Sequence, residues 1–188
     1  KKEEEKKRKE KEALKKKETF EWLAKRFSDA MDQFKEDARK KVEKHSTEAF
    51  LSIVPEPERY GGISISERWD ITVTDSDGKP KITLNPGHKQ MIAISMLDGL
   101  RQTSELNFPT FFDNPGSNIA DDTLDRMVDH FWSDQKNQVV MLSHGGGLKM
   151  NETIEEYGDA LAKSWEVSYS EEGTTSQIIE LDMRTKGD

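Results

Sequence analysis

Three short segments of the sequence carry the types of residue that bind phosphate groups and metal ions. The first is residues 84–90, in which Pro86 suits the first position of a helix and Asn85 is a natural N-cap. The free N–H groups at the start of a helix, together with the helix dipole, form a site for an anion. On its own the segment is more simply explained as an ordinary capped helix, so it gains weight only in combination with the two later segments.

The second and third segments are apolar runs that each end in a side chain able to do chemistry. Residues 108–112 lead to Asp113, and residues 139–143 lead to His144. Because ligand sites in α/β folds lie at the carboxyl ends of parallel strands, both side chains are expected at one sheet edge. There Asp113 is placed to hold Mg²⁺ through water, since hard cations prefer oxygen ligands. The simpler alternatives are a loop cap for Asp113 and a structural role for His144.

These segments require helices and a sheet to position them, and the hydrophobic pattern predicts both. Helices are expected over 86–104 and 121–133, and buried strands over 108–112 and 138–142. Helices that alternate with buried strands indicate a parallel α/β core. The inward side of the first helix is expected to consist of Met91, Ile92, Ile94, Ser95, Leu97 and Leu100.

Further strands are expected before and after this core. Alternating apolar residues predict a β-hairpin or meander over 63–73, with Trp69 in its second strand and a turn at 75–78. Two more strands are expected around 165–167 and 178–181.

The first 50 residues differ from the rest in composition and predict a helical arm. Residues 1–18 are almost all charged, and from Phe20 an apolar stripe follows with spacings of 3, 4, 4, 3, 4 and 4 residues up to Val42. An eleven-residue repeat of this kind favours a straight or slightly right-handed helix pair. A partner helix from another part of the protein is expected on the stripe. The alternative is a helix folded back on its own domain.

Composition and charge limit the possible functions. The 188 residues are 35% charged and 32% hydrophobic, and they include no cysteine, which excludes disulfides and thiolate zinc sites. No apolar run approaches the roughly 20 residues that span a bilayer. The net charge of -8 is uneven, because residues 1–18 carry +4, and an acidic body argues against DNA binding by bulk charge alone. The first residue is not Met, which predicts that the chain is part of a longer protein.

Taken in this order, the three segments resemble the signature loop, the Walker B strand and the switch histidine of an ABC-type ATPase head of the SMC superfamily. The resemblance implies an α/β fold: the C-terminal lobe of such a head, half of a parallel-sheet P-loop NTPase, with a β-hairpin and an N-terminal coiled-coil arm. It divides the chain into a coiled-coil arm, residues 1–50, and a C-terminal head lobe, residues 51–188. Within the superfamily, residues 60–69, the helix at 90–97 and Pro109 are most similar to the DndD-type DNA-phosphorothioation ATPases.

The resemblance also implies roles for individual residues. Asn85 and Gly87 stand at signature positions that contact the γ-phosphate of ATP bound on the opposite head. Asn118 to Asp121 cover the D-loop, which crosses the dimer interface, although the D-loop aspartate falls on Ala120 by strict count. Asn85 replaces the usual serine, and its amide NH₂ group can still donate to a phosphate oxygen.

Asp113, Asn114 and His144 receive roles in the same way. Asp113 matches the Walker B aspartate that holds Mg²⁺, and His144 matches the histidine that senses the γ-phosphate. Asn114 stands at the position of the catalytic glutamate. An amide cannot accept a proton from the attacking water, and general-base help is typically worth roughly 10²–10⁴-fold, so slow turnover is expected.

The implied cofactors are ATP and Mg²⁺. No G-x-x-x-x-G-K-[ST] motif occurs in the chain, so an N-terminal ATPase lobe is expected to supply the Walker A loop. Further implied partners are a second head in a homodimer, DNA and other DNA-modification proteins, in the cytoplasm and without a membrane. The expected function is that of a DNA-processing ATPase in DNA phosphorothioation or a related defence. The alternatives are a double-strand-break-repair or other SMC-type ATPase, a degenerate scaffold that binds ATP with little hydrolysis, and an unrelated α/β domain with a helical arm.

Overall fold

The computed structural model describes residues 1–81, 83–104, 109–116, 118–133, 138–143, 161–169 and 175–181, with only the backbone described at 132 and 133. In chain order the elements are α1 (Lys2–Ile53), the short 3₁₀ helix η1 (Pro57–Arg59), β1 (Tyr60–Ile65), β2 (Ile71–Asp75), α2 (Pro86–Thr103), β3 (Thr110–Asp113), α3 (Asp121–Ser133), β4 (Val139–Leu142), β5 (Ser164–Tyr169) and β6 (Ser176–Leu181). The helices and strands lie close to where the sequence predicted them. His144 lies outside the described residues.

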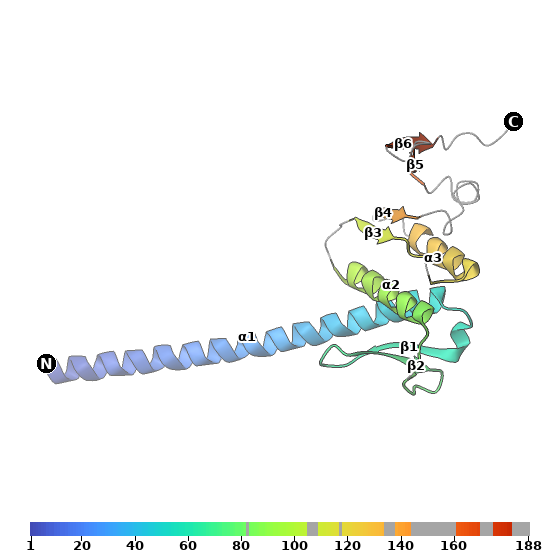
Figure 1. Ribbon diagram of the computed structural model, residues 1–188. Coiled ribbons are helices and arrows are strands. Elements are labelled where there is room, and N and C mark those ends of the chain that lie inside the picture. The colour runs from blue at the N-terminus through green and yellow to red at the C-terminus, as the bar shows by residue number, and fades with distance from the viewer. Residues whose placement is uncertain are drawn as a thin grey trace.

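Helix α1 is a long arm that carries the N-terminus away from the rest of the molecule (Figure 1). Its 52 residues rise about 1.5 Å each, which gives a length of roughly 78 Å. The predicted apolar stripe is exposed here: Phe20, Phe27 and Phe34 are 69%, 70% and 67% exposed. A helix folded back on its own domain is therefore wrong for this part of the arm. Neither α1 nor any other helix in the described part is long and apolar enough to cross a membrane.

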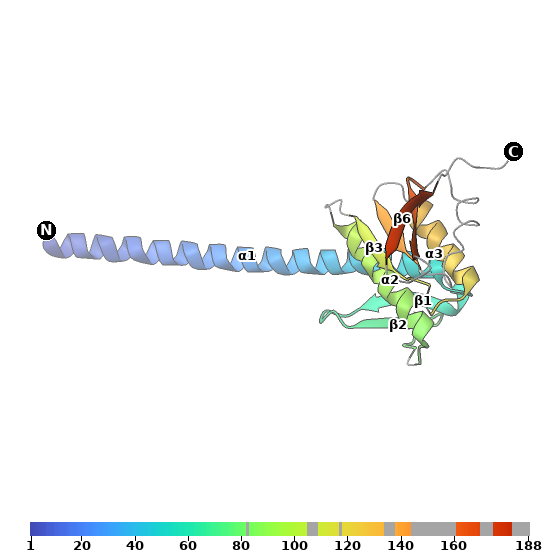
Figure 2. The same cartoon turned by 45° about the horizontal axis from the view of Figure 1, so that its top comes forward.

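The base of α1 lies at the centre of the packed part of the molecule. Val42, Ala49 and Phe50 are buried there, and α2 packs along the same stretch of helix. Figures 1 and 2 show the β1–β2 hairpin on one side of this helix pair and the strands β3 and β4 on the other. The arm is therefore continuous with the core and not merely attached to its surface.

The buried face of α2 differs from the prediction. It follows the series Met91, Ile94, Ser95, Asp98 and Arg101. Leu97 and Leu100, which were predicted on this face, are 37% and 48% exposed. The hydrophobic pattern placed Leu97 and Leu100 on the buried face, but Asp98 and Arg101 are buried in their place. These two charged side chains tolerate burial because they form an ion pair at 2.7 Å.

The strands β1 and β2 form an antiparallel hairpin in which Ile63 pairs with Val73. Side chains of α1 form hydrogen bonds with the backbone at the other edge of β1. Thr47 Oγ1 donates to the Ile63 carbonyl at 2.9 Å and accepts from the Ile63 N–H at 3.0 Å. Glu43 Oε2 accepts from the Ile65 N–H at 2.6 Å. Because an open strand edge invites pairing with another chain, these contacts protect β1 and join it to the arm.

Trp69 does not lie in the second strand, as the alternation predicted. It lies in the turn between β1 and β2, in the left-handed region with a φ of 65°, and is 45% exposed. Its N–H donates to the Ser66 carbonyl at 2.8 Å, so local hydrogen bonds of the turn decide its conformation. The predicted turn at 75–78 is confirmed by the bond from Gly78 N–H to the Asp75 carbonyl at 2.9 Å.

The predicted parallel α/β unit is confirmed for β3 and β4, which pair in parallel with Asp113 opposite Leu142. Helix α3 connects the two strands and buries Met127 and Phe131. The Phe131 ring packs against Phe112 of β3 with 4.8 Å between centroids. The carboxyl ends of both strands therefore lie at one edge of the sheet.

The last two predicted strands are confirmed as the antiparallel pair β5–β6, in which Val167 lies opposite Ile178. Large apolar side chains on this pair are exposed, with Trp165 at 48%, Val167 at 55% and Ile178 at 74%. Each of the three sheets within the described residues has two strands.

Candidate functional site

The predicted anion site at the start of α2 has the N-cap that the sequence indicated. Asn85 Oδ1 accepts a hydrogen bond from the His88 N–H at 2.8 Å. The same oxygen lies 2.7 Å from His88 Nδ1. Because a carbonyl oxygen only accepts, Nδ1 must carry the imidazole proton. The helix start thus combines its free N–H groups with an exposed side-chain amide.

His88 in turn contacts Tyr60 of β1. The Tyr60 hydroxyl lies 2.6 Å from His88 Nε2, and Lys81 Nζ lies 3.7 Å from the centre of the Tyr60 ring. Burial, followed by the positive charges of Lys81 and Arg59, lowers the pKa of His88, while burial raises the pKa of Tyr60. A lowered pKa favours the neutral imidazole, and in that form the phenol donates to the lone pair of Nε2.

The signature segment, residues 84–90, touches the loop that follows β3. A Cβ atom at Gly87 would stand 2.6 Å from the Asn118 carbonyl oxygen, so only glycine fits there. Gln90 strengthens the contact, because its Nε2 donates to the Pro115 carbonyl at 2.5 Å and its Oε1 accepts from Asn118 Nδ2 at 3.2 Å. Two segments that the sequence predicted to act together are therefore joined directly.

Asp113 is the last residue of β3, and its side chain is exposed at the carboxyl edge of the β3–β4 pair. Asn114 follows in the left-handed region with a φ of 48°, and its N–H donates to the Leu142 carbonyl at 2.7 Å. Asparagine adopts this conformation more readily than most residues. The backbone conformation therefore favours asparagine at position 114, independent of any role in catalysis.

Asp121 and His144 are the remaining predicted site residues. Asp121 is exposed in the first turn of α3, where a carboxylate interacts favourably with the helix dipole. Of Asn118 and Asp121, only Asn118 is hydrogen-bonded to the signature segment within the described residues. His144 lies outside the described residues, and its role as the switch histidine stays a prediction.

Asp113 is the residue that could hold a metal ion. Among the described residues, no three His, Cys, Asp or Glu side chains come together to form a metal site. Mg²⁺ is commonly held by one or two carboxylates together with waters and substrate phosphates. The exposed carboxylate of Asp113 offers oxygen ligands of the kind that Mg²⁺ prefers.

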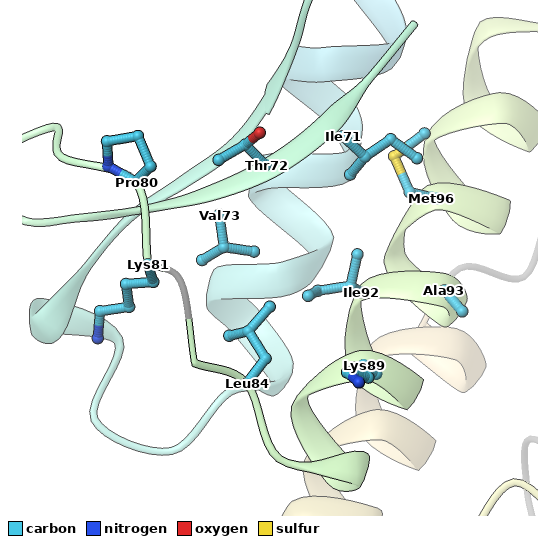
Figure 3. Close-up of a pocket in the computed structure, with 10 residues that line it drawn as sticks. All are labelled: Ile71, Thr72, Val73, Pro80, Lys81, Leu84, Lys89, Ile92, Ala93 and Met96. Atoms are coloured by element: carbon cyan, nitrogen blue, oxygen red, sulfur yellow. The ribbon is translucent and has the colours of Figure 1, made fainter.

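A groove of about 510 Å³ lies between β2 and α2, beside the signature segment. Val73, Leu84 and Ile92 face one another across it (Figure 3), and Lys81 and Lys89 are the charged residues of its lining. A lining of this kind suits apolar side chains better than a triphosphate. The candidate anion site therefore remains at the start of α2.

Comparison with known proteins resolves the fold but not a family. No protein-family model matches the chain, and no curated protein matches it. A structure described for the ATP-driven dimerisation and DNA-stimulated activation of SMC ATPases matches with a TM-score of 0.60 at 13% identity, over 81% of this chain and 90% of that one. The SMC head with an extended coiled coil from Pyrococcus furiosus, bound to the C-terminal domain of ScpA, gives a TM-score of 0.57 at 13% identity. The SMC head with a coiled coil and joint from Pyrococcus yayanosii gives 0.56 at 14% identity.

The chain shares the fold of SMC ATPase head domains. It is covered to 78% and 77% by the two Pyrococcus structures, and it spans only 36% and 27% of their length. The SMC-head fold agrees with the predicted α/β class, the long N-terminal helix and the parallel pair β3–β4.

Three residues that organise this candidate site were not assigned roles from the sequence: Tyr60, His88 and Gln90. No sequence signal pairs Tyr60 with His88, since they lie 28 residues apart on different elements. Gln90 could have been found, because it follows Gly87 by three residues on the same helix, where side chains share a face.

A buried polar cluster that joins α2 to the other two helices was also missed. Asp98 is fully buried and accepts hydrogen bonds from Arg101 Nη2 at 2.7 Å, Gln102 Nε2 at 2.6 Å and His130 Nε2 at 3.0 Å. His130 Nδ1 lies 2.9 Å from Ser52 Oγ at the end of α1. Burial opposes the charge of Asp98, but the hydrogen bonds from His130, Arg101 and Gln102 outweigh it and keep the pKa of Asp98 below its ordinary value.

Ser52, His130 and Asp98 follow one another in the order of a hydrolase triad. The Ser52 hydroxyl, however, donates its one proton to the Ala49 carbonyl at 2.7 Å, one turn earlier on α1. A proton engaged with the helix backbone is not available for transfer to an imidazole. The cluster is therefore explained as a structural link between the three helices.

Proposed function

We propose that this chain forms the C-terminal lobe of an ATPase head that binds ATP and Mg²⁺ across an interface between two heads. Residues 1–50 form the coiled-coil arm in this proposal, and residues 51–188 form the lobe. The observation that carries it is the direct contact between the signature segment and the loop after β3, made by Gly87 and Gln90. The shared fold of SMC heads supports it.

The proposal gives each site residue a part in holding the nucleotide. Asn85 and the backbone of Gly87 donate to the γ-phosphate of ATP on the opposite head. Asp113 holds Mg²⁺ through water at the edge of the β3–β4 pair. Asn118 and Asp121 lie at the interface between the heads.

The remaining parts of the proposal involve His144, which lies outside the described residues, and the partners of the head. His144 senses the γ-phosphate after β4. A second lobe supplies the Walker A loop, because no such motif occurs in these 188 residues. A second copy of the head completes each site, and the exposed stripe of α1 pairs with another helix to form the coiled coil.

The process that the ATPase serves is proposed at two levels. The SMC heads that share the fold support an SMC-type or double-strand-break-repair ATPase. DNA phosphorothioation, with DNA and other DNA-modification proteins as partners, rests on the sequence cues at 60–69, 90–97 and Pro109 alone. The first level has the broader support.

The test is to measure ATP-dependent dimerisation and DNA-stimulated hydrolysis with full-length protein that includes both lobes. ATP bound at an interface stabilises the dimer by mass action, so dimers are expected with ATP and Mg²⁺ and monomers without them. Hydrolysis is expected to be slow and to rise with DNA. The absence of both ATP-dependent dimers and hydrolysis would overturn the proposal.

A degenerate scaffold, which holds ATP with little hydrolysis, is the second candidate because Asn114 cannot act as a base. Asn114→Glu restores a carboxylate of the usual length, although glutamate adopts the left-handed conformation at position 114 less readily. Asn114→Asp is the matched control, since aspartate tolerates that conformation but is shorter. If wild type shows no turnover and neither variant gains any, the scaffold is favoured. A gain with Asn114→Glu alone favours the slow ATPase.

A further inference from the structure

We infer that His88 is a positioning residue for nucleotide binding: it holds the Asn85 carboxamide so that its NH₂ group donates to a γ-phosphate. The inference rests on the proposed function, in which Asn85 meets ATP bound on the opposite head. The observation that carries it is the double use of Asn85 Oδ1 by His88, through the backbone N–H at 2.8 Å and through Nδ1 at 2.7 Å.

The two contacts decide which end of the Asn85 amide faces the helix. A carboxamide has one end that accepts and one that only donates, and the His88 N–H selects the accepting end. The Nδ1–H of His88 adds a second donor to the same oxygen, so rotation of the amide would lose both hydrogen bonds. Asn85 is exposed, and within the described residues its Nδ2 has no hydrogen bond, so the donating end is left for a ligand.

Tyr60 decides which nitrogen of His88 carries the proton. Its hydroxyl lies 2.6 Å from Nε2, and by donating to that nitrogen it keeps the proton on Nδ1. Phe50 of α1 packs edge-on against the Tyr60 ring with 5.4 Å between centroids, and Lys81 Nζ lies over the ring at 3.7 Å. The signature side chain is thereby connected to the hairpin and to the base of the arm.

A structural role and a positioning role for His88 predict different measurements. A helix cap needs only the bond from the backbone N–H of residue 88 to Asn85, which any residue except proline would supply. If the imidazole of His88 is only structural, its removal would therefore change the stability of the head or the affinity of the monomeric head for ATP. A positioning imidazole changes the association of two heads around ATP, since Asn85 contacts the nucleotide of the other head.

The test uses full-length protein with both lobes. Dimerisation in ATP is measured by analytical ultracentrifugation, monomer affinity with a fluorescent ATP analogue, and stability by thermal unfolding. His88→Phe keeps a ring but removes both nitrogens. The dimer dissociation constant is expected to rise about tenfold or more, because a hydrogen bond to a charged group is lost, while the monomer affinity stays unchanged.

Two variants serve as controls for His88→Phe. His88→Gln offers one donor and one acceptor of similar reach and is expected to recover most of the loss. His45→Phe introduces the same side chain at a partly exposed position of α1 and is expected to leave dimerisation unchanged.

An Asn85→Ser background shows whether His88 acts through Asn85. A serine hydroxyl rotates freely and needs no imidazole to orient it, so His88→Phe is expected to have little further effect there. An equal effect of His88→Phe in both backgrounds would overturn the inference, because the two positions would then be independent. Normal dimerisation of His88→Phe with the native Asn85 would overturn it as well.

A measurement on the wild type keeps the inference testable even where a variant does not fold. The ¹⁵N NMR spectrum of selectively labelled histidine at neutral pH is expected to show the Nδ1–H tautomer for His88. An Nε2–H tautomer, which has no proton on Nδ1 to donate to Asn85 Oδ1, would overturn the inference and leave the proposed function intact. Wild-type heads that fail to dimerise in ATP and do not hydrolyse it would overturn the proposed function itself.

Discussion

Gly99 of α2 lies so close to Ser46 of α1 that a Cβ atom at position 99 would stand 2.0 Å from Ser46 Oγ. The same atom would come within 2.8 Å of the Ser46 backbone nitrogen and 2.9 Å of the Val42 carbonyl oxygen. Two of these neighbours are backbone atoms, which cannot move without shifting a helix. The glycine therefore sets the distance between the arm and the helix that carries the signature segment.

Replacing Gly99 with alanine is expected to destabilise the protein. Overpacking of this kind typically costs about 1–3 kcal/mol, which equals or exceeds the roughly 1 kcal/mol that alanine gains over glycine within a helix. The free energy of unfolding from urea titration checks this. Lys89→Ala, at an exposed position of the same helix, is the control and is expected to change the free energy little. Equal stability of Gly99→Ala and wild type would contradict this close packing of the two helices.

Replacing Asp98 with asparagine is expected to be more damaging. The side chain of Arg101 is 2% exposed, and its charge would lose the hydrogen-bonded carboxylate of Asp98. Breaking a buried pair by removing one partner costs about 3–5 kcal/mol. Calorimetry or urea titration measures the loss. Asp125→Asn, on the exposed side of α3, provides the matched control.

The pH dependence of the Asp98 contribution follows from its lowered pKa. A carboxyl group with a depressed folded-state pKa stabilises the fold above its unfolded value of about 4, and this stabilisation is lost as pH falls through the folded value. The difference in unfolding free energy between wild type and Asp98→Asn is therefore expected to stay constant between pH 7 and about 5 and to shrink below about 4. Urea midpoints across this range would show it. A difference that does not depend on pH would mean that the charge of Asp98 contributes nothing.

Replacing Thr47 with valine tests the attachment of the hairpin to the arm. Valine keeps the shape but removes the hydroxyl that both donates to and accepts from Ile63. A partly buried backbone N–H and C=O left without a partner cost about 1–3 kcal/mol, so a loss of that size is expected in urea titration. Thr19→Val on the exposed arm has the same chemistry without the contact to β1 and is expected to be nearly neutral.

Replacing Asp113 with asparagine tests the proposed metal role. The side chain is exposed, so stability is expected to change little, while ATP hydrolysis by full-length protein is expected to fall by roughly two orders of magnitude or more. Activity is measured at several Mg²⁺ concentrations, with the exposed Asp125→Asn as control. Hydrolysis equal to wild type at all of them would exclude Asp113 as a metal ligand.

Local sequence patterns predicted most of the elements of this fold. The start of α2 was predicted because Pro86 and Asn85 are residues with a defined preference for the first positions of a helix. The parallel pair of strands was predicted because apolar runs alternated with a helical pattern, and Asp113 ends its strand as expected. Errors arose where packing overrode hydrophobicity: Leu97 and Leu100 are exposed, while a charged pair is buried.

By itself, the sequence determined the identity and order of the helices and strands. It also determined that Asn85 caps α2 and that Asp113 lies at the end of a strand. These features depend on neighbouring residues, whose spacing alone decides which faces they share. Only the tertiary structure decided that Tyr60 meets His88 and that Gln90 meets the Pro115 carbonyl, across separations of 28 and 25 residues. Such contacts depend on how separate elements pack against one another. The periodicity of a single sequence does not show which residues of different elements come into contact.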